Sequence, residues 1–578
     1  MQVDIAKTAG FCMGVRRAVD MAIDTANQKK GPICTYGPLI HNPQVLDLLR
    51  DKGIPVLEEI PESGEGTILI RAHGVPPGTR EKLASAGFHI LDATCPKVIR
   101  VQNIIRKHKD SGFHVIIAGD ADHPEVVGLL GYADNQGHVV HDLSELEKLP
   151  IFEKAIIVAQ TTQNVEAYAA IRNWALTRAP HYKVFDTICD STERRQEETR
   201  KLAEKVDLVL VVGGRESGNT RRLAEVAAET GTRSLHIESV AEIDEKIFEG
   251  VHSVGITAGA STPNWILRQV LFYCEERTQN RNGLRCKLKK LQNWLLNTNI
   301  YQALGAGSMA YTALVLQGLE KGLSFVAIAF SYILSMLLFN SLSSIPADRY
   351  NNPDRAGMYE KRKGLFIGLA MVTGLSGLLL ALEKGVLPFV IFFLMSLAGL
   401  LYRAPLLPAS LTGGRIFRLK DIPASKTLFI SLSWAMVCVI LPTFSIRGSA
   451  DLVSLSVFLF VIVLIFVRTA FLDILAMQGD RIAGRETLPI LIGEKRSRLL
   501  LKKVLLALLA GMALVTALGL FPRISLLLGL SPLFLIFLLR FDGRRKFSAN
   551  VPIAFYIETA VILTGFLSLI ISLLSGGL

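Results

Sequence analysis

The chain has 578 residues, of which 50% are apolar and 20% are charged, and its formal net charge is +12 at pH 7. These values exclude an intrinsically disordered chain, and the mean hydropathy of +0.37 is too high for an ordinary soluble enzyme. All eleven His residues lie between His41 and His252, whereas long apolar runs dominate from about Leu291 onward. The composition therefore predicts a soluble α/β first half and a membrane-spanning second half.

The cysteines and the start of the chain indicate a reducing cytoplasm for the first half. The seven Cys residues are odd in number and irregular in spacing, which argues against a disulfide framework. The start of the chain lacks a basic stretch followed by an apolar one, so we expect no secretory signal. Much of the basic excess lies in short loops between apolar runs, which is typical of cytoplasmic membrane loops rather than of a nucleic-acid partner.

Short apolar runs in the first half alternate with segments that are compatible with helices. The runs are rich in β-branched residues, and most of them end in Gly or a small polar residue. This alternation predicts parallel sheets, with functional residues in the turns that follow the carboxyl ends of the strands. The clearest runs are residues 67–70, 113–120, 154–160, 207–214 and 253–259.

Three cysteines fall on comparable turns, and their spacing indicates an internal repeat. Cys12 lies in GFCMG, Cys95 in DATCP and Cys189 in TIC, so they are separated by 83 and 94 residues. We therefore expect three similar α/β units, each offering one thiolate to a common centre. Three convergent thiolates can hold an iron–sulfur cluster, whereas zinc sites more often use close C-x-x-C pairs, which this sequence lacks. The alternative is that these are buried structural cysteines.

Three His residues occur in turns with Gly or Pro close by. His41 follows Gly-Pro in YGPLIHNPQV, His73 ends an apolar strand in RAHGVPP, and His123 follows another strand in GDADHPEVVG. A single His is usually structural, but three in equivalent turns favour a shared site, because imidazoles donate hydrogen bonds to anionic oxygens. The last of these motifs also places Glu125 beside the group.

Two further turns carry hydroxyl and amide side chains where a strand passes into a helix. GGRESGNTRRLAE contains Ser217 and Asn219, and GITAGASTPNWI contains Ser261. Free N–H groups at helix N-termini favour phosphate. Together with the three imidazoles, these groups predict a cradle for a diphosphate.

These motifs together resemble the 4-hydroxy-3-methylbut-2-enyl diphosphate reductase family, also called LytB or IspH, from Met1 to about Gln279. The resemblance implies that Cys12, Cys95 and Cys189 bind a 4Fe–4S cluster. It also implies that Glu125 is the proton donor. The residues that it implies in substrate binding are His41, His73, His123, Thr161, Ser217, Gly218, Asn219 and Ser261.

The resemblance implies a reaction as well. The substrate, 4-hydroxy-3-methylbut-2-enyl diphosphate, would lose its hydroxyl as water and give isopentenyl and dimethylallyl diphosphate, the last step of the non-mevalonate isoprenoid pathway. Ferredoxin or flavodoxin would supply the electrons, and Thr161 in AQTTQN would position the substrate alcohol. Gly218 stands where many members carry a second Ser, and its backbone N–H can serve there.

A polar and basic segment predicts the domain boundary. We expect a reductase domain over residues 1–279, a basic linker over 280–293 and a membrane domain over 294–578. The linker is predicted to lie against an anionic membrane surface. The alternative is that it forms the last surface helix of the soluble domain.

Nine apolar runs without charged residues follow this boundary. A helix needs about 20 residues to cross a bilayer core of about 30 Å, so each run predicts one spanning helix. Loops after every second helix are rich in Lys and Arg, which orients them and the first half to the cytoplasm. We therefore expect an all-α domain of nine transmembrane helices in the cell inner membrane. The runs are residues 291–319, 322–347, 364–382, 385–402, 427–446, 452–467, 504–522, 524–539 and 559–578.

Two polar stretches at helix ends are suited to chemistry, because carboxylates at membrane depth usually mark a site. One runs from Asn340 to Asp348 and the other from Asp473 to Asp480. Two acid clusters on one face can hold Mg²⁺ against a diphosphate. With LYRAPLLP, FRLKDIPASK and GRETLPILIG, these stretches resemble the UbiA family of membrane prenyltransferases, roughly from Leu291 to the C-terminus.

The match to the UbiA acid patterns is incomplete. The residues that match are Asn340, Asp348, Asp473 and Asp480. The resemblance implies that they hold Mg²⁺ and a prenyl diphosphate, whose prenyl group passes to a lipophilic acceptor. Positions that are acidic in the patterns carry Ser341, Ser344 and Ala476 here.

Three readings of the whole chain therefore stay open. The first is a bifunctional fusion of reductase and prenyltransferase, and the second is the same reductase with a catalytically inactive membrane anchor or lipid-binding module. The third is a lipid-binding or transport protein with a vestigial soluble half. The intact reductase motifs argue against the third.

Overall fold

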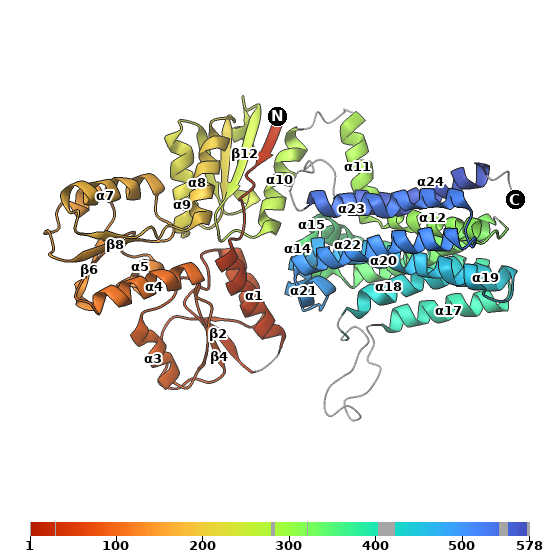
Figure 1. The fold of residues 1–578 in the computed structure, drawn as a ribbon, viewed down its shortest axis with the longest axis horizontal. Helices are drawn as coiled ribbons and strands as arrows, with labels where there is room; N and C mark the ends of the chain where they lie inside the picture. The colour runs from red at the N-terminus through yellow and green to blue at the C-terminus, as the bar shows by residue number, and fades with distance from the viewer. Residues whose placement is uncertain are drawn as a thin grey trace. The chain divides into compact units, whose positions relative to one another are not determined.

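The computed structural model describes residues 2–28, 31–278, 284–320, 322–402, 422, 424–542 and 553–574. The chain divides into two compact units, Met1–Arg281 and Asn282–Leu578. In Figure 1, strands and helices alternate in the first unit, and the described part of the second unit is helical. The segment 280–293, predicted as a linker, contains the start of helix α11 (Leu284–Asn297), and residues 280–283 lie outside the described part.

The first unit contains three parallel sheets of four strands each. The strands are β1 (Gln2–Ile5), β2 (Ile33–Tyr36), β3 (Val56–Leu57), β4 (Thr67–Ile70), β5 (His89–Asp92), β6 (His114–Ala118), β7 (Gly137–Val140), β8 (Ala155–Ala159), β9 (Lys183–Val184), β10 (Leu208–Val212), β11 (Arg233–Ile237) and β12 (Ser253–Ala258). The first sheet has the order β3-β2-β4-β5, and the second has the order β7-β6-β8-β9. The third has the order β1-β12-β10-β11, so the strand at the start of the chain completes it.

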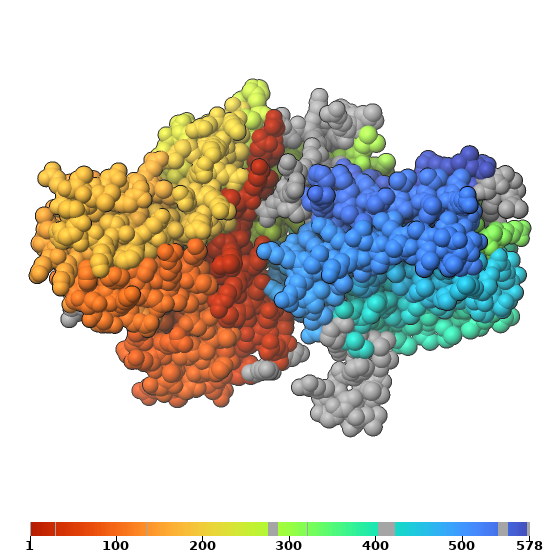
Figure 2. Space-filling view, in the orientation of Figure 1, coloured from red at the N-terminus to blue at the C-terminus, as the bar shows by residue number. Residues whose placement is uncertain are grey.

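The three sheets share one topology, and we call each sheet with its helices a repeat. In the first two sheets, the strand that comes second in sequence lies at one edge and the strand that comes first lies next to it. The strands that come third and fourth in sequence then follow in that order to the opposite edge. The third sheet has the same order when β10 is its first strand and β1 its fourth. β1 pairs with β12 from Gln2 opposite Ser253 to Ile5 opposite Ile256, and Figure 2 shows red N-terminal residues running along the yellow part of this unit. The predicted set of three similar α/β units is confirmed.

Helices begin in the turns that follow the strands. Four of them, α2 (Pro43–Asp51), α3 (Pro77–Ser85), α4 (Pro96–Lys109) and α5 (Pro124–Leu130), have Pro at their first position, where its fixed φ suits a helix and its missing N–H is not needed. The strands β8 and β10 are buried along their whole length, as expected of parallel strands with both faces covered. The helices are α1 (Met13–Asn27), α2 (Pro43–Asp51), α3 (Pro77–Ser85), α4 (Pro96–Lys109), α5 (Pro124–Leu130), α6 (Leu143–Leu146), α7 (Val165–Arg178), α8 (Asp190–Ala203), α9 (Gly218–Glu229) and α10 (Asn264–Thr278).

Apolar helices make up the described part of the second unit. Seven helical segments are long and apolar enough to cross a membrane: α13 (Leu323–Leu342), α16 (Lys363–Glu383), Ser425–Ile446, α20 (Leu452–Ile482), α22 (Glu494–Ala517), Arg523–Phe541 and α24 (Ile553–Leu574). Two further apolar helices, α12 (Ile300–Leu316) and α17 (Val386–Leu401), have 17 and 16 residues. At 1.5 Å per residue they span only about 26 and about 24 Å. Seven spans are therefore supported, and the total of nine stays a prediction.

Shorter helices connect or extend these segments. They are α14 (Ile345–Asn351), α15 (Pro353–Lys361), α18 (Ser425–Ala435), α19 (Leu441–Ile446), α21 (Leu488–Ile492) and α23 (Leu530–Asp542). A π-helical turn over Met436–Ile440 joins α18 to α19, so that these two form one of the seven long segments. α14 follows α13 and carries Asp348, the last residue of the first predicted acid stretch, and α15 follows α14.

A buried ion pair lies on the longest helix of the second unit. Arg468 in α20 donates two hydrogen bonds to Glu558 in α24, one of them from Nε at 3.1 Å, and neither side chain is more than 4% exposed. The guanidinium also lies over the ring of Trp434, 5.4 Å from its centroid. The pairing neutralises this charge inside the protein, and α20 continues well past Val467, where the predicted run ended. The second pair of predicted acids therefore lies on this helix.

We predict that Glu558→Ala strongly destabilises the second unit, because it leaves the Arg468 guanidinium buried without a partner. Removing one member of a buried pair typically costs about 3–5 kcal/mol. The control is Glu494→Ala, since Glu494 is 42% exposed in its pair with Arg498 and such helical pairs contribute only about 0.3–0.5 kcal/mol. Thermal unfolding of the full chain in detergent should give a much lower midpoint for the first variant. Equal midpoints for the two variants would contradict this role of the pair.

Candidate functional site

The three predicted cysteine ligands occupy equivalent positions in the three repeats. Cys12 lies between β1 and α1, Cys95 between β5 and α4, and Cys189 between β9 and α8. Each is the last residue before the helix that follows the fourth strand of its sheet. Because the strands of each sheet are parallel, all three turns lie at carboxyl ends, where functional residues of parallel sheets gather.

The cysteines converge on one another. A Cβ atom built on Gly14 would lie only 2.5 Å from Sγ of Cys95, so α1 approaches this thiol closely. Burial raises the pKa of Cys95, and the charges of Cys12 and Cys189 raise it further, which places both within charge–charge range. The N–H of Val15 donates to Sγ of Cys12 at 3.4 Å, which fixes this side chain at the start of α1. Three half-buried thiols so arranged fit a 4Fe–4S cluster.

The other predicted site residues of the first unit follow the same repeat. The turns after the first strands carry His41, His123 and Ser217, each five residues beyond the last residue of its strand. The turns after the third strands carry His73, Thr161 and Ser261. Each repeat therefore supplies three residues, one from the turn after its first strand, one from the turn after its third strand, and the cysteine from the turn after its fourth strand. The sequence motifs that seemed separate are related by this internal symmetry.

The three His side chains gather at one point. Their ring centroids are 4.8, 5.3 and 5.7 Å apart, and one nitrogen from each lies within 4.8 Å of the others. Nε2 of His41 and Nδ1 of His73 are buried without a hydrogen-bond partner. The N–H of Glu125 donates to Nδ1 of His123 at 3.1 Å, so a neutral His123 carries its proton on Nε2. Buried nitrogens without a protein partner are rare, and these two are available to bind an added group.

The imidazoles are neutral near pH 7. Burial lowers the pKa of His41, lowers that of His73 well below its ordinary value, and lowers that of His123 to about 4. The positive charge of Arg71 acts in the same direction on all three. Neutral imidazoles beside an Arg side chain suit an anionic ligand, and a bound anion would raise all three pKa values.

Hydroxyl and amide groups complete this pocket. Ser261 Oγ donates to Ser217 Oγ at 3.2 Å, and Ser217 caps the start of α9. The nitrogen and the oxygen of the Asn219 amide are both buried without a partner. A Cβ atom at Gly218 would lie 3.4 Å from the His123 ring, in van der Waals contact, so this backbone position lies beside the imidazole. The imidazole spacing would also suit one metal ion, but these donors at a helix N-terminus favour a phosphate.

Glu125 is buried next to this pocket with Thr161 as its partner. Its Oε1 accepts a hydrogen bond from the Thr161 N–H at 2.7 Å, and its Oε2 accepts one from the Thr161 hydroxyl at 2.8 Å. The residue is 1% exposed, and burial raises its pKa to about 7 although the bonds from Thr161 oppose the shift. Such a carboxyl holds a proton near neutral pH and can deliver it.

A cavity of about 490 Å³ opens onto the His cluster. Charged residues that were not predicted as site residues, although they lie within the quoted motifs, also line it, among them Asp120, Arg221 and Arg222. Arg222 pairs with Asp120 at 2.9 Å at the edge of the cavity. The clearest signal in the sequence was that of Arg221, because it lies four residues after Ser217 and so falls on the same face of a helix.

The predicted polar site of the second unit is a cluster of charges. Its predicted residues are Asn340 in α13, Asp348 in α14, and Asp473 and Asp480 in α20. The charges of Lys426 and Arg485 act on both Asp348 and Asp480, so the groups lie near one another. Most of the motifs LYRAPLLP and FRLKDIPASK, at 403–421 and 423, lie outside the described residues.

The two acids on α20 already have positively charged partners. Asp473 accepts hydrogen bonds from Nζ of Lys426 at 2.7 Å and from the hydroxyl of Thr427 at 3.0 Å. Asp480 accepts one from the Arg485 guanidinium at 3.0 Å. Both carboxylates are therefore held by neighbours on the loop and helix that flank α20.

The third acid also faces a cation. Oδ2 of Asp348 lies 3.8 Å from Nε of Arg355, and burial raises the pKa of Asp348 although nearby cations oppose the shift. Arg355 donates to Oγ of Ser341, at one of the positions that is acidic in the UbiA pattern, and to Oδ1 of Asn299 at 2.8 Å. Mg²⁺ prefers carboxylates that are free to bind it. The donors in the described part of this cluster do not fit that ion, and Mg²⁺ stays a prediction from resemblance.

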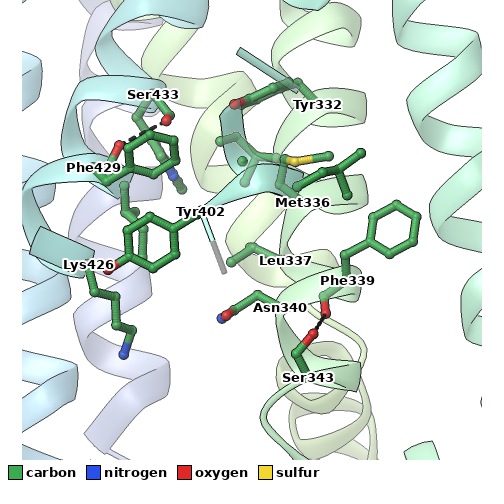
Figure 3. A pocket seen from close by; sticks show the side chains of 15 residues that line it. Tyr332, Met336, Leu337, Phe339, Asn340, Ser343, Tyr402, Lys426, Phe429 and Ser433 are labelled. Carbon is green, nitrogen blue, oxygen red and sulfur yellow. Dashed lines mark hydrogen bonds between the residues drawn. The ribbon is translucent and has the colours of Figure 1, made fainter. Parts of the chain in front are cut away.

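An apolar pocket of about 190 Å³ adjoins the cluster (Figure 3). Lys426 and Asn340 lie toward one end of it, and Tyr332 and Ser433 lie toward the other. The apolar walls between them include Met336, Leu337, Phe339, Phe429 and Trp434. Such a pocket suits a ligand with an apolar chain and a polar head.

Comparisons with known proteins match the two units separately. Residues 3–275 match the LytB protein family, and residues 302–570 match the UbiA prenyltransferase family. A 4-hydroxy-3-methylbut-2-enyl diphosphate reductase from Geotalea uraniireducens (strain Rf4) is 44% identical over 282 residues, which are 49% of this chain and 100% of that relative. One of the same name from Pelobacter propionicus is 47% identical over 271 residues, 47% of this chain and 96% of that relative. A solved structure of (E)-4-hydroxy-3-methyl-but-2-enyl diphosphate reductase is 40% identical, covers 48% of this chain and 100% of its own, and has a TM-score of 0.38.

We predict that Gly14→Ala lowers the iron bound by the first unit, because the added methyl group would collide with Sγ of Cys95. The matched control is Gly78→Ala, since a Cβ atom there meets nothing within 4 Å. Iron per chain is measured after anaerobic reconstitution, and circular dichroism checks that both variants are folded. A folded Gly14→Ala protein with the iron content of the control would show that this close approach does not shape the centre.

Proposed function

Because the chain belongs to the LytB protein family through residues 3–275, and residues 302–570 match the UbiA prenyltransferase family, we propose that it is a reductase fused to a prenyl-transferring membrane domain. The first unit converts 4-hydroxy-3-methylbut-2-enyl diphosphate into isopentenyl and dimethylallyl diphosphate. Relatives at 42–47% identity are named for this reductase. The observation that carries the proposal is the convergence of three cysteines with a buried, unpartnered set of phosphate donors.

The reaction breaks one C–O bond and forms one C–H bond. The substrate takes up two electrons and two protons, and its hydroxyl oxygen leaves as water. A 4Fe–4S cluster held by Cys12, Cys95 and Cys189 supplies the electrons when it is bound, with ferredoxin or flavodoxin as the proposed donor. The remaining chemistry, binding of the diphosphate and delivery of the protons, belongs to side chains of this chain.

The diphosphate binds where the imidazoles, hydroxyls and amides meet. His123 presents Nε2–H because its Nδ1 accepts from the backbone, and His41 and His73 can each donate from a nitrogen that has no other partner. The Asn219 amide and the N-terminus of α9 add uncharged donors. Buried donors without another partner give up no hydrogen bond within the protein when they bind phosphate. The site is therefore organised before the substrate arrives.

Glu125 supplies the protons. Its pKa, raised to about 7, leaves a large fraction of the carboxyl protonated at neutral pH, and the Thr161 hydroxyl, which can rotate, accepts or donates at the same carboxyl oxygen. A proton can therefore pass from Glu125 through the Thr161 hydroxyl to the substrate oxygen that leaves as water. Burial excludes bulk water from the carboxyl, which limits competing proton transfer.

We predict that Glu125→Gln lowers kcat by about 10²–10⁴-fold without loss of iron, because it removes the proton donor only. In the unaltered protein kcat should fall as pH rises through about 7, where the Glu125 carboxyl loses its proton. The Gln variant should lack this pH dependence. The control is Glu153→Gln, an exposed acid in the same repeat. A Gln variant with normal kcat and an unchanged pH profile would exclude Glu125 as the donor.

The second unit completes the proposal. It binds a prenyl diphosphate with its chain in the apolar pocket and transfers the prenyl group to a lipophilic acceptor, with release of diphosphate and a proton. The seven long apolar helices and the UbiA match support a multi-pass membrane protein. The proposed location is the cell inner membrane, with the reductase unit in the cytoplasm, because the basic loops alternate as the positive-inside rule requires.

A further inference from the structure

The charged cluster of the second unit is balanced without a metal ion. Its three predicted acids face three cations, Lys426, Arg355 and Arg485. The formal charge of these six groups therefore sums to zero. A divalent cation would have to displace an ammonium or a guanidinium from a buried carboxylate, and like-charge repulsion would oppose its entry.

The cations, and not the acids, are the accessible members of the two closest pairs. The side chain of Lys426 is 28% exposed, whereas that of Asp473 is 3% exposed. In the same way, the side chain of Arg485 is 23% exposed and that of Asp480 is 2% exposed. The carboxylates thus lie behind the cations and hold them in place. A ligand that approaches the cluster meets positive charge first.

Lys426 also connects the cluster to the apolar pocket. Lys426 and Asn340 both line one end of that pocket, and Figure 3 shows the polar groups of the two side chains at this end. The walls beyond them are aromatic and aliphatic. A ligand that fits both features has an anionic head and a long apolar chain.

We infer that Lys426 and Arg485 bind the phosphate head of a prenyl lipid directly, without a divalent cation, while its chain occupies the pocket of Figure 3. Direct binding is chemically suitable, because an Arg guanidinium matches phosphate oxygens in two places and a Lys ammonium acts as a point charge. The buried carboxylates keep the two cations oriented when no ligand is bound. This inference rests on the prenyl diphosphate binding proposed for the second unit.

The test measures binding by titration calorimetry on the full chain in lipid nanodiscs. The probes are farnesyl diphosphate, farnesyl monophosphate and farnesol, each in buffer with EDTA and in buffer with millimolar MgCl₂. We expect the Kd of the phosphorylated probes to agree within about twofold in the two buffers, and farnesol to bind at least about tenfold more weakly. The two phosphorylated probes distinguish a monophosphate from a diphosphate as the preferred head.

The matched variant is Lys426→Met with Asp473→Asn, which removes the cation without leaving a buried carboxylate unpaired. It should weaken both phosphorylated probes by about tenfold or more in either buffer, and Lys426→Arg should restore most of the affinity. The control is Lys503→Met, an exposed residue of α22 that does not line the pocket. Unchanged thermal midpoints check that the variants are folded.

Each outcome separates the inference from the function on which it rests. Binding that needs Mg²⁺, or that is unaffected by the double variant, overturns direct recognition by the cations but keeps a prenyl-diphosphate site. Equal affinity for farnesol overturns recognition of the phosphate head. Absence of binding for every probe overturns both the inference and the proposed function of the second unit. Reductase activity measured on the same samples reports the first unit independently.

Discussion

The site of the first unit depends on one constraint of parallel sheets, namely that their strands all end at the same edge. Three sheets of the same topology each present three turns at that edge, after the first, third and fourth strands. The turns after the fourth strands bring the thiols together, and the other turns bring imidazoles, hydroxyls and Glu125 together. Residues from distant parts of the chain thereby meet without long loops. Every chemical step proposed for the reductase needs this convergence.

Much of this arrangement was predictable from the sequence, because its signals are local. Runs of β-branched residues marked strands, and Gly, Pro and Cys marked the turns after them. The role of β1 was not predictable in the same way. It is a short strand with a charged residue, Asp4, and its partner β12 lies near the other end of the unit. Only long-range pairing shows that the third sheet closes with the start of the chain.

The predictions for the second unit that rested on the positions of charged residues were less accurate, because the sequence alone does not show which charges are paired. A span was expected to end before Arg468, but a buried carboxylate neutralises this residue and the helix continues. The two acids near the end of the same helix match a metal-binding pattern, but each forms an ion pair instead. Asp473 pairs with Lys426, which lies far from it in the sequence, and Asp480 pairs with Arg485. Hydropathy located the helices well and gave no account of these long-range ion pairs.

The two units depend on opposite treatments of buried polar groups. In the first unit, donors such as the Asn219 amide and two imidazole nitrogens have no partner, which prepares them for an anionic ligand. In the second, each predicted acid is matched by a cation that is at least as exposed. Both arrangements present positive or hydrogen-donating groups to a ligand. Such surfaces suit phosphorylated isoprenoids, the class of compound common to the functions proposed for the two units.

The most direct measurement is the content of iron and acid-labile sulfide in the anaerobically purified chain and in single Cys→Ser variants. Convergence of the three thiols predicts about four iron and about four sulfide per chain in the unaltered protein and in Cys34→Ser. It predicts loss of most of both in Cys12→Ser, Cys95→Ser and Cys189→Ser. Full iron and sulfide in any one of these three, or none in the unaltered protein, would contradict a common centre.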